Sequence, residues 1–254
     1  MSQSVVVYGI HAVTALLAHR PESVLELFVG AGDDDRLEEL LALAGRAGVV
    51  AQGVRQSVLD RLCEGGVHQG VAARCRPRLP GDDHALWDYL VAQGERPLLI
   101  LVLDQVQDPR NLGACLRCAE AAGAQAVVAP RRHSAPLTPA ARKAAAGAAE
   151  IQPYFQLPNL ARGLQTLQEL GVRCVAVDSP RPGTPALYDL DLTGSVALVV
   201  GAEGRGLRRL TLERCDASAT IPMPGTIPSL NVAVAAGIAL FEALRQRRKG
   251  SVQV

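Results

Sequence analysis

Three polar segments of this sequence combine residue types that can bind and orient a substrate. They cover residues 104–117 (DQVQDPRNLGACLR), 201–207 (GAEGRGL) and 221–232, where IPMPG leads into PSLNV. Each follows the end of a run that we interpret as a buried strand, and ligands of open α/β sheets bind just beyond the carboxyl ends of such strands. Amide, hydroxyl, guanidinium and carboxylate groups gathered there predict a binding or catalytic site.

Each segment also has a purely structural interpretation. Asn111 can cap a helix, and Arg117 can pair with Glu120 three residues later on an exposed helix face. Ser229 can cap the last helix and leave Asn231 in its first turn. The glycines of the second segment can form a tight turn. Any one segment fits this interpretation, but three of them at strand ends favour a site.

The glycine pattern argues against two nucleotide-binding classes. Gly201, Gly204 and Gly206 follow the order G-x-x-G-x-G, whereas dinucleotide-binding folds use G-x-G-x-x-G. The chain also lacks the G-K-[ST] triplet that a phosphate-binding P-loop requires. We therefore expect neither a nicotinamide enzyme nor a nucleoside triphosphatase.

The cysteines indicate structural roles. Cys115 and Cys118 form a C-x-x-C pair, but no second pair or pair of histidines completes a zinc set. Both lie in a predicted helix, where small buried thiols are common, so we expect no metal. Unpaired cysteines without a secretory leader favour the reducing cytoplasm.

Alternating strands and helices position these segments. In the first section we expect strands at 5–8, 24–29, 49–54 and 71–75, and helices at 10–17 and 36–47. A Pro/Gly/charge break at 76–83 and a short helix at 85–92 follow. In the second section we expect strands at 98–103, 126–129, 172–177 and 196–200, and helices at 111–122, 139–148 and 230–247. The pattern predicts an α/β fold with a mainly parallel sheet, divided into residues 1–76, a linker at 77–95 and a larger domain at 96–254.

Composition and charge exclude a membrane protein and a globally basic one. The chain has 254 residues, 48% hydrophobic, with a formal net charge of +1. Its longest apolar run near the C-terminus, 232–240, is far shorter than the ~20 residues that cross a bilayer. Contacts with nucleic acid must therefore come from local clusters. The candidates are Arg74, Arg76 and Arg78; Arg131 and Arg132; Arg205, Arg208 and Arg209; and Arg245, Arg247, Arg248 and Lys249.

The polar segments resemble the SpoU (TrmH-type) family of RNA ribose 2′-O-methyltransferases. Residues 111–123, with the pattern N-x-G-x3-R-x-A-x3-G, resemble its first motif, and 201–206, with G-x-E-G-x-G, resemble its second. Residues 221–232, with IPM and SLNV, resemble its third. In the first section, YGIHAV at 8–13 and HQGV at 68–71 resemble the substrate-binding domain of the member that methylates a guanosine in the peptidyl-transferase P-loop of 23S rRNA.

The resemblance implies roles for individual residues. The S-adenosylmethionine pocket would be lined, mostly through backbone groups, by Gly201, Ile221, Met223 and Leu230. Arg117 would be the principal catalytic residue. Arg117 is also sometimes proposed as the base, which is difficult for a guanidinium because it holds its proton so strongly. We favour the alternative, in which Arg117 clamps the target phosphate and stabilises the forming alkoxide. The catalytic set would be completed by Asn111, Glu203, Ser229 and Asn231.

The resemblance also implies a fold, a substrate and partners. It implies a SPOUT-type catalytic domain with a C-terminal trefoil knot, a small N-terminal α/β RNA-binding domain, and a homodimer that methylates 23S rRNA. The runner-up functions are a tRNA 2′-O-methyltransferase and a non-catalytic RNA-binding ribosome-assembly factor, although a pure binder has no need of the complete polar set. Pro228 and Ala233 depart from the family pattern, which commonly has a small flexible residue and a serine there.

Overall fold

The computed structural model describes residues 4–30, 35–179, 183–202 and 206–251, with side chains described to residue 248. The chain forms two compact units. The first contains Met1–Leu79 together with Leu137–Ile151, and the second contains Pro80–Pro136 and Gln152–Val254. The segment 137–151 therefore leaves the second unit, folds with the first, and returns.

The first unit is built on a four-stranded mixed sheet in the order β1-β4-β2-β3. Strand β4 pairs antiparallel with β1 and β2, while β2 and β3 run parallel. Its elements are β1 (Val5–Tyr8), α1 (Ile10–His19), η1 (Pro21–Ser23), β2 (Val24–Val29), α2 (Asp35–Arg46), β3 (Ala51–Gly53), α3 (Gln56–Leu62), β4 (Val71–Cys75), α6 (Pro139–Ala145) and α7 (Ala148–Ile151).

Helices cover both faces of this sheet. Leu16 and Leu17 of α1 and Leu40 of α2 pack with Leu27 of β2 in one core. On the other face, Leu59 of α3 joins a smaller cluster. Helix α7 packs against α1.

The second unit contains a six-stranded parallel sheet in the order β10-β8-β9-β5-β6-β7. All six carboxyl ends therefore lie along the same edge. Its elements are α4 (Asp83–Val91), β5 (Leu99–Asp104), α5 (Pro109–Ala121), β6 (Ala126–Pro130), β7 (Tyr154–Leu157), α8 (Leu160–Glu169), β8 (Arg173–Asp178), η2 (Leu187–Asp189), β9 (Val196–Gly201), α9 (Arg209–Glu213), β10 (Ala217–Thr220) and α10 (Val232–Ser251).

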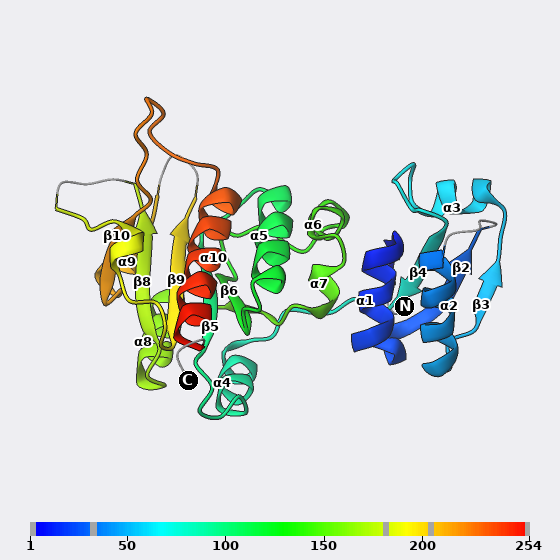
Figure 1. Cartoon of the computed structure of the whole chain (residues 1–254), viewed down its shortest axis with the longest axis horizontal. Coiled ribbons are helices and arrows are strands. Elements are labelled where there is room, and N and C mark those ends of the chain that lie inside the picture. Colours follow the sequence, from blue (N-terminus) through cyan, green and yellow to red (C-terminus); the bar gives the residue numbers. More distant parts are fainter. Residues whose placement is uncertain (1–3, 31–34, 180–182, 203–205, 252–254) are drawn as a thin grey trace. The chain divides into compact units, whose positions relative to one another are not determined.

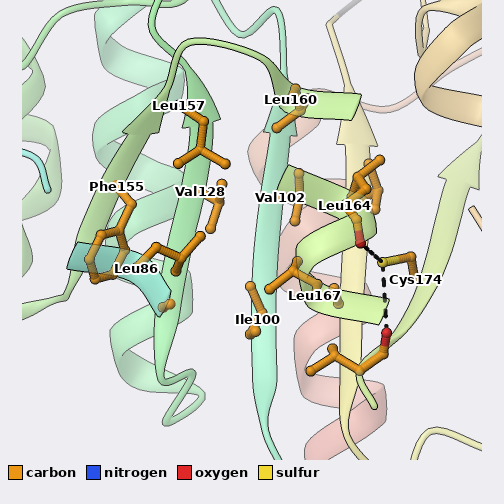
Figure 2. Packing of buried hydrophobic residues seen from close by; sticks show 14 of the residues in the cluster. Leu86, Ile100, Val102, Val128, Phe155, Leu157, Leu160, Leu164, Leu167 and Cys174 are labelled. Atoms are coloured by element: carbon orange, nitrogen blue, oxygen red, sulfur yellow. Dashed lines mark hydrogen bonds between the residues drawn. The ribbon is translucent and has the colours of Figure 1, made fainter. Parts of the chain in front are cut away.

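Helices also enclose the parallel sheet from both sides. Leucines of α4 and α8 pack onto alternate side chains of the strands, as Figure 2 shows for Leu86 beside Phe155 and for Leu164 and Leu167 near Val102 and Ile100. On the opposite face, α5 and α10 lie side by side (Figure 1) and α10 contacts β5 and β9. Every residue of β5 is buried, as expected for a parallel strand covered twice.

The predicted α/β fold with a parallel sheet is confirmed. One predicted helix is two helices in the structure, and several elements were not predicted. The helix expected over 139–148 is two helices, α6 and α7, because the chain turns left-handed at Ala146 (φ 49°) and Gly147 (φ 94°). A Cβ at position 147 would lie 2.7 Å from Cα of Ala12 in α1, so only glycine fits there. The sequence interpretation also missed α3, β7, α8, α9 and β10.

Within the described residues, no helix has both the length and the apolar character needed to cross a membrane.

Candidate functional site

A cavity of about 460 Å³ opens at the carboxyl ends of β8 and β9 and beside the segment that follows β10. Val177 and Asp178 contribute from β8, and Val200 and Gly201 from β9. The wall contributed by the 221–235 segment consists of Ile221, Met223, Ile227, Pro228, Ser229, Leu230, Val232 and Ala235. Its size and mixed lining are typical of a site for a small organic molecule.

Gly201 and Gly206 bring two backbone segments together at the floor of this cavity. A Cβ on Gly201 would overlap the backbone of Gly206, whose own N–H donates to the carbonyl of Ala202 (2.9 Å). A Cβ on Gly206, where φ is +65°, would lie 2.8 Å from Oδ1 of Asp178. Gly201 and Gly206 are therefore required by a close approach around the cavity and not only by a turn.

A buried ion pair holds the same floor in place. Asp104 is fully buried at the end of β5 and pairs across the sheet with Gly201 of β9. Its carboxylate accepts from Nε of Arg208 (2.8 Å) and from the backbone N–H of Arg208 (3.0 Å). This bidentate contact fixes the chain just after Gly206, so Asp104 and Arg208 are positioning residues. The sequence analysis did not predict this role, and it had placed Arg208 in a basic cluster that could contact nucleic acid.

Asp178 was also missed, although the sequence contained a signal for both aspartates. LILVLD of β5 and RCVAVD of β8 each end an apolar run with an acid at the carboxyl end of the strand. An acid at that position faces the ligand edge of a parallel sheet. The two aspartates take different positions. Asp178 lines the cavity, whereas the carboxylate of Asp104 is paired with Arg208.

Asn231 links the start of α10 to α5. Its Oδ1 accepts from the backbone N–H of Ala233 (3.0 Å), and its Nδ2 donates to Oδ1 of Asn111 (3.0 Å). Asn231 is thus the N-cap of α10, and the structural alternative that gave this position to Ser229 is wrong. Ser229 lies in the cavity wall instead.

The interpretation of Asn111 as a helix cap is also wrong. Helix α5 begins at Pro109, and Oδ1 of Asp108 caps it by accepting from the backbone N–H of Arg110 (2.7 Å). Pro109 suits the first helical position because it has no N–H to leave unpaired. Asn111 therefore lies in the first turn, where its amide is directed to Asn231.

Arg117 lies two turns further along α5 and is exposed. Among the described residues no ion pair or hydrogen bond engages its guanidinium, so the alternative pairing with Glu120 is absent. Arg117 does not line the 460 Å³ cavity itself. Glu203, Gly204 and Arg205 lie outside the described residues.

The small residues of α10 are buried within the chain. Ala236 and Leu240 are inaccessible, and Sγ of Cys118 in α5 lies 3.9 Å from the carbonyl oxygen of Ala233. A Cβ on Gly237 would lie 3.5 Å from the same sulfur. This face of α10 therefore packs against α5 of the same chain.

The cysteines have structural positions, as expected. All six are free thiols, and Cys115 and Cys118 lie in α5. Burial raises the pKa of both, so neither is a reactive thiolate at neutral pH. No group of three or more histidine, cysteine or acidic side chains among the described residues could hold a metal ion.

Several of the basic clusters are used internally. Arg74 pairs with Glu26 (2.6 Å), Arg245 pairs with Glu242 (2.7 Å), and Arg247 donates to the carbonyl of Leu98 (2.8 Å). In contrast, the arginines that follow β6 are exposed, and within the described part of the chain their guanidinium groups have no ion-pair or hydrogen-bond partner. These are Arg131 and Arg132.

Comparison with known proteins agrees with this geometry. Residues 98–241 match the model of the SpoU rRNA methylase family, and residues 6–80 match the model described as RNA 2′-O ribose methyltransferase substrate binding. The chain belongs to the SpoU rRNA methylase family. The residues matched by this family model, 98–241, include all three polar segments.

Relatives are similar over nearly the full length. A protein of Pasteurella multocida named 23S rRNA (guanosine-2′-O-)-methyltransferase RlmB is 50% identical, covering 95% of this chain and 98% of the relative. A protein of the same name from Pseudomonas syringae is 48% identical, covering 97% and 98%. Among solved structures, an AdoMet-bound rRNA methyltransferase of Sinorhizobium meliloti has a TM-score of 0.73 and 26% identity, covering 95% of this chain and 87% of that one.

The cavity fits the cofactor used by such relatives. Branched side chains of its lining offer apolar contacts for a purine, and the Asp178 carboxylate and Ser179 and Ser229 hydroxyls offer partners for hydroxyl and amino groups. The close approach of the Gly201 and Gly206 backbones leaves no space for a side chain at position 201. All the residues assigned to the cofactor by resemblance line this one cavity, namely Gly201, Ile221, Met223 and Leu230.

Proposed function

We propose that this protein methylates the ribose 2′-hydroxyl of a guanosine in 23S rRNA, using S-adenosylmethionine as the methyl donor. The supporting observation is the 50% and 48% identity to relatives with that activity in their names, over 95% and 97% of this chain. Residues 1–76 would bind the RNA, 77–95 would form a linker, and 96–254 would carry the catalytic site.

S-adenosylmethionine, when bound, supplies a methyl group activated by its sulfonium charge. The new bond joins the ribose O2′ to the methyl carbon, the C–S bond breaks, its electron pair stays on sulfur, and the hydroxyl proton leaves to solvent or a base. The protein must therefore align the hydroxyl and stabilise negative charge on O2′. Alignment of this kind can contribute roughly 7–11 kcal/mol to lowering a barrier.

The chain has residues suited to each task. Gly201, Ile221, Met223 and Leu230 would hold the cofactor, with Asp178 accepting from its ribose hydroxyls. Arg117 would bind the target phosphate and stabilise the forming alkoxide, since an exposed guanidinium is cationic and can make two parallel bonds to a phosphate. The nucleotide would be oriented by Asn111, Ser229 and Asn231, and Glu203 would hold Arg117 or its loop.

The runner-up substrate, tRNA, is less well supported. A solved structure titled for 2-OH methylation of C/U34 on tRNA is 32% identical and has a TM-score of 0.54, but it covers only 60% of this chain. The relatives named for 23S rRNA, in contrast, cover 95% and 97% of this chain. We propose the guanosine of the peptidyl-transferase P-loop as the target. We also propose that the protein acts on this rRNA in the cytoplasm.

We also propose the assembly and topology that the family resemblance implies. A C-terminal trefoil knot would enclose the cofactor, consistent with a cavity built from the chain segments that follow β8, β9 and β10. Two apolar residues of α10, Val234 and Phe241, are exposed and lie seven positions apart. A homodimer would cover them.

Methyl transfer with labelled cofactor tests the proposal. The intact protein should label 23S rRNA but not tRNA, and mass spectrometry of rRNA from cells with and without the protein should locate one 2′-O-methylguanosine. The Arg117→Ala variant should lose roughly 100- to 1,000-fold in kcat, the range seen when a group stabilising a developing oxyanion is removed. Its cofactor affinity should stay unchanged.

Glu120→Ala is the matched control, because Glu120 is an exposed residue of the same helix. It should transfer methyl groups at the parental rate. If Arg117→Ala remains within threefold of the parent, the role of Arg117 is wrong. If the intact protein binds 23S rRNA but never methylates it, the assembly-factor alternative replaces the enzyme.

A further inference from the structure

A second cavity, of about 330 Å³, lies between α4 and α8 at the carboxyl end of β7. The indole of Trp87 is 40% exposed there, although tryptophan is usually well buried and the chain contains only this one. We call this cavity the Trp87 groove. Its polar and aromatic lining consists of Asp83, His84, Trp87, Asn159, Arg162 and Thr166.

The residue types of the groove suit an unpaired RNA nucleotide. An exposed indole offers a flat surface on which a nucleobase stacks, and single-stranded RNA is commonly bound by such stacking. Arg162 is exposed and can neutralise a phosphate or stack on the base. Asp83 can accept from the amino group of a base, as carboxylates do in base recognition.

A series of direct contacts connects this groove to the candidate catalytic site within one compact unit. The backbone N–H of Arg131, after β6, donates to the carbonyl of Leu157 in the groove wall (2.7 Å). Four residues later, the N–H of Ala135 donates to the carbonyl of Val106 (2.8 Å), in the segment that leads into α5 and Asn111.

Charge along this path is positive and accessible. Arg131 and Arg132 are both exposed between the two sites. Strands β9 and β7 are separated by β5 and β6, so at ~4.8 Å per strand the carboxyl ends of these two strands are about 15 Å apart. At a rise of roughly 3.4 Å per stacked nucleotide, that distance corresponds to a few nucleotides of RNA.

We propose that the Trp87 groove binds an unpaired nucleobase of the substrate RNA, close in sequence to the methylated ribose. The base stacks on Trp87, Arg162 contacts its phosphate, and Arg131 and Arg132 hold the strand between the groove and the catalytic site. This proposal rests on the proposed function, because it takes RNA to be the substrate. It assigns RNA recognition to the catalytic unit in addition to the N-terminal section.

The single tryptophan allows a direct test. A short single-stranded RNA should quench the fluorescence of Trp87 in the intact protein, while the same oligomer without bases should not. Trp87→Leu should raise the KM for 23S rRNA roughly tenfold or more, with kcat at saturating RNA and cofactor affinity unchanged. Trp87→Phe, which keeps a stacking ring, should restore most of the affinity.

Two controls separate the groove from general effects. Val91→Ala alters an exposed residue one turn later on α4, and Arg96→Ala removes an exposed cation outside the groove. Neither should change the KM, whereas Arg162→Ala should raise it.

The outcomes distinguish this proposal from the proposed function. If the parent methylates 23S rRNA while Trp87→Leu has the parental KM and no RNA quenches fluorescence, the groove proposal is overturned and the function stands. If the parent does not methylate RNA, the function fails, and base-dependent quenching of Trp87 still decides whether the groove binds RNA.

Discussion

Asn231 connects helices α5 and α10 of the candidate site through the nitrogen and oxygen atoms of its side-chain amide. Its oxygen accepts from the first N–H groups of α10, and its nitrogen donates to Asn111 in the first turn of α5. The cap fixes where α10 begins, and the contact between the amides fixes how α5 approaches it. The orientation of the Asn111 and Asn231 side chains, which we propose to contact the nucleotide, therefore depends on this residue.

Replacing Asn231 by Ala should lower the free energy of unfolding by about 1 kcal/mol, the usual effect of losing a helix cap. Asn231→Asp keeps the cap oxygen but removes the Nδ2 donor to Asn111. We expect near-parental stability for Asn231→Asp in urea denaturation, together with a loss of methyl transfer comparable to that of Asn231→Ala. Parental activity in Asn231→Asp would mean that the contact between the amides has no catalytic importance.

At the scale of elements, α6 and α7 are tied to the first unit by one buried carboxylate. Glu150 is 1% exposed and accepts from the guanidinium groups of Arg20 and Arg142 and from the backbone N–H of Arg78 (3.1 Å). These partners come from the C-terminal end of α1, where Arg20 follows the last helical residue, from α6 and from the segment after β4. One acid therefore holds together pieces of chain separated by up to 130 positions.

Glu150→Gln should destabilise the first unit by roughly 3–5 kcal/mol, because it leaves guanidinium groups without their charged partner. Hydrogen exchange should speed up in α1, α6 and α7, while β5 and β9 stay protected. Glu213→Gln is the control, since the ion pair of Glu213 with Arg209 is exposed and should contribute less than about 1 kcal/mol. Equal effects of the two variants would contradict this role of Glu150.

The elements missed from the sequence had signals of unequal strength. Leucines at 160, 164 and 167, with Asn159 as cap, form a regular helical pattern that could have predicted α8. Strands β7 and β10 have four residues each, and ASAT of β10 has little apolar content. Such strands form because neighbours supply hydrogen bonds, so local composition does not predict them.

At the scale of the whole molecule, the buried thiols make stability depend on alkaline pH. Burial raises the pKa of Cys174 and Cys215 to about 12 and that of Cys63 to about 11, whereas an unfolded thiol has a pKa near ~8.5. The folded state then binds more protons than the unfolded state once pH exceeds the unfolded value. Stability should therefore be complete below about pH 8.5 and fall as the pH rises toward the folded pKa values.

Urea midpoints measured from pH 7.5 to 10.5 test this dependence. Cys174→Ala should be less stable at pH 7.5, because it leaves a small cavity, but should lose less stability on going to pH 10.5. A parental slope in Cys174→Ala would show that this thiol does not contribute to the alkaline loss.

The sequence alone determined the α/β class, most strands, the polar segments and the family resemblance. These follow from local signals: apolar runs predict buried strands, and residue types at fixed spacing within one segment are preserved when that segment folds. The residues assigned to the cofactor come from two such segments, and both reach the same cavity.

Only the tertiary structure decided which partner each polar group takes. Asp104 forms an ion pair with Arg208, and Asn111 accepts a hydrogen bond from Asn231. Glu150 binds segment 137–151 to the first unit through Arg20. Trp87 lines a groove and is not part of a core. Each of these contacts joins residues distant along the chain, and their energies depend on burial and geometry that exist only after the sheet and helices have packed. Local spacing has no information on such pairs, since the same side chain can cap, pair or face solvent in an identical sequence context.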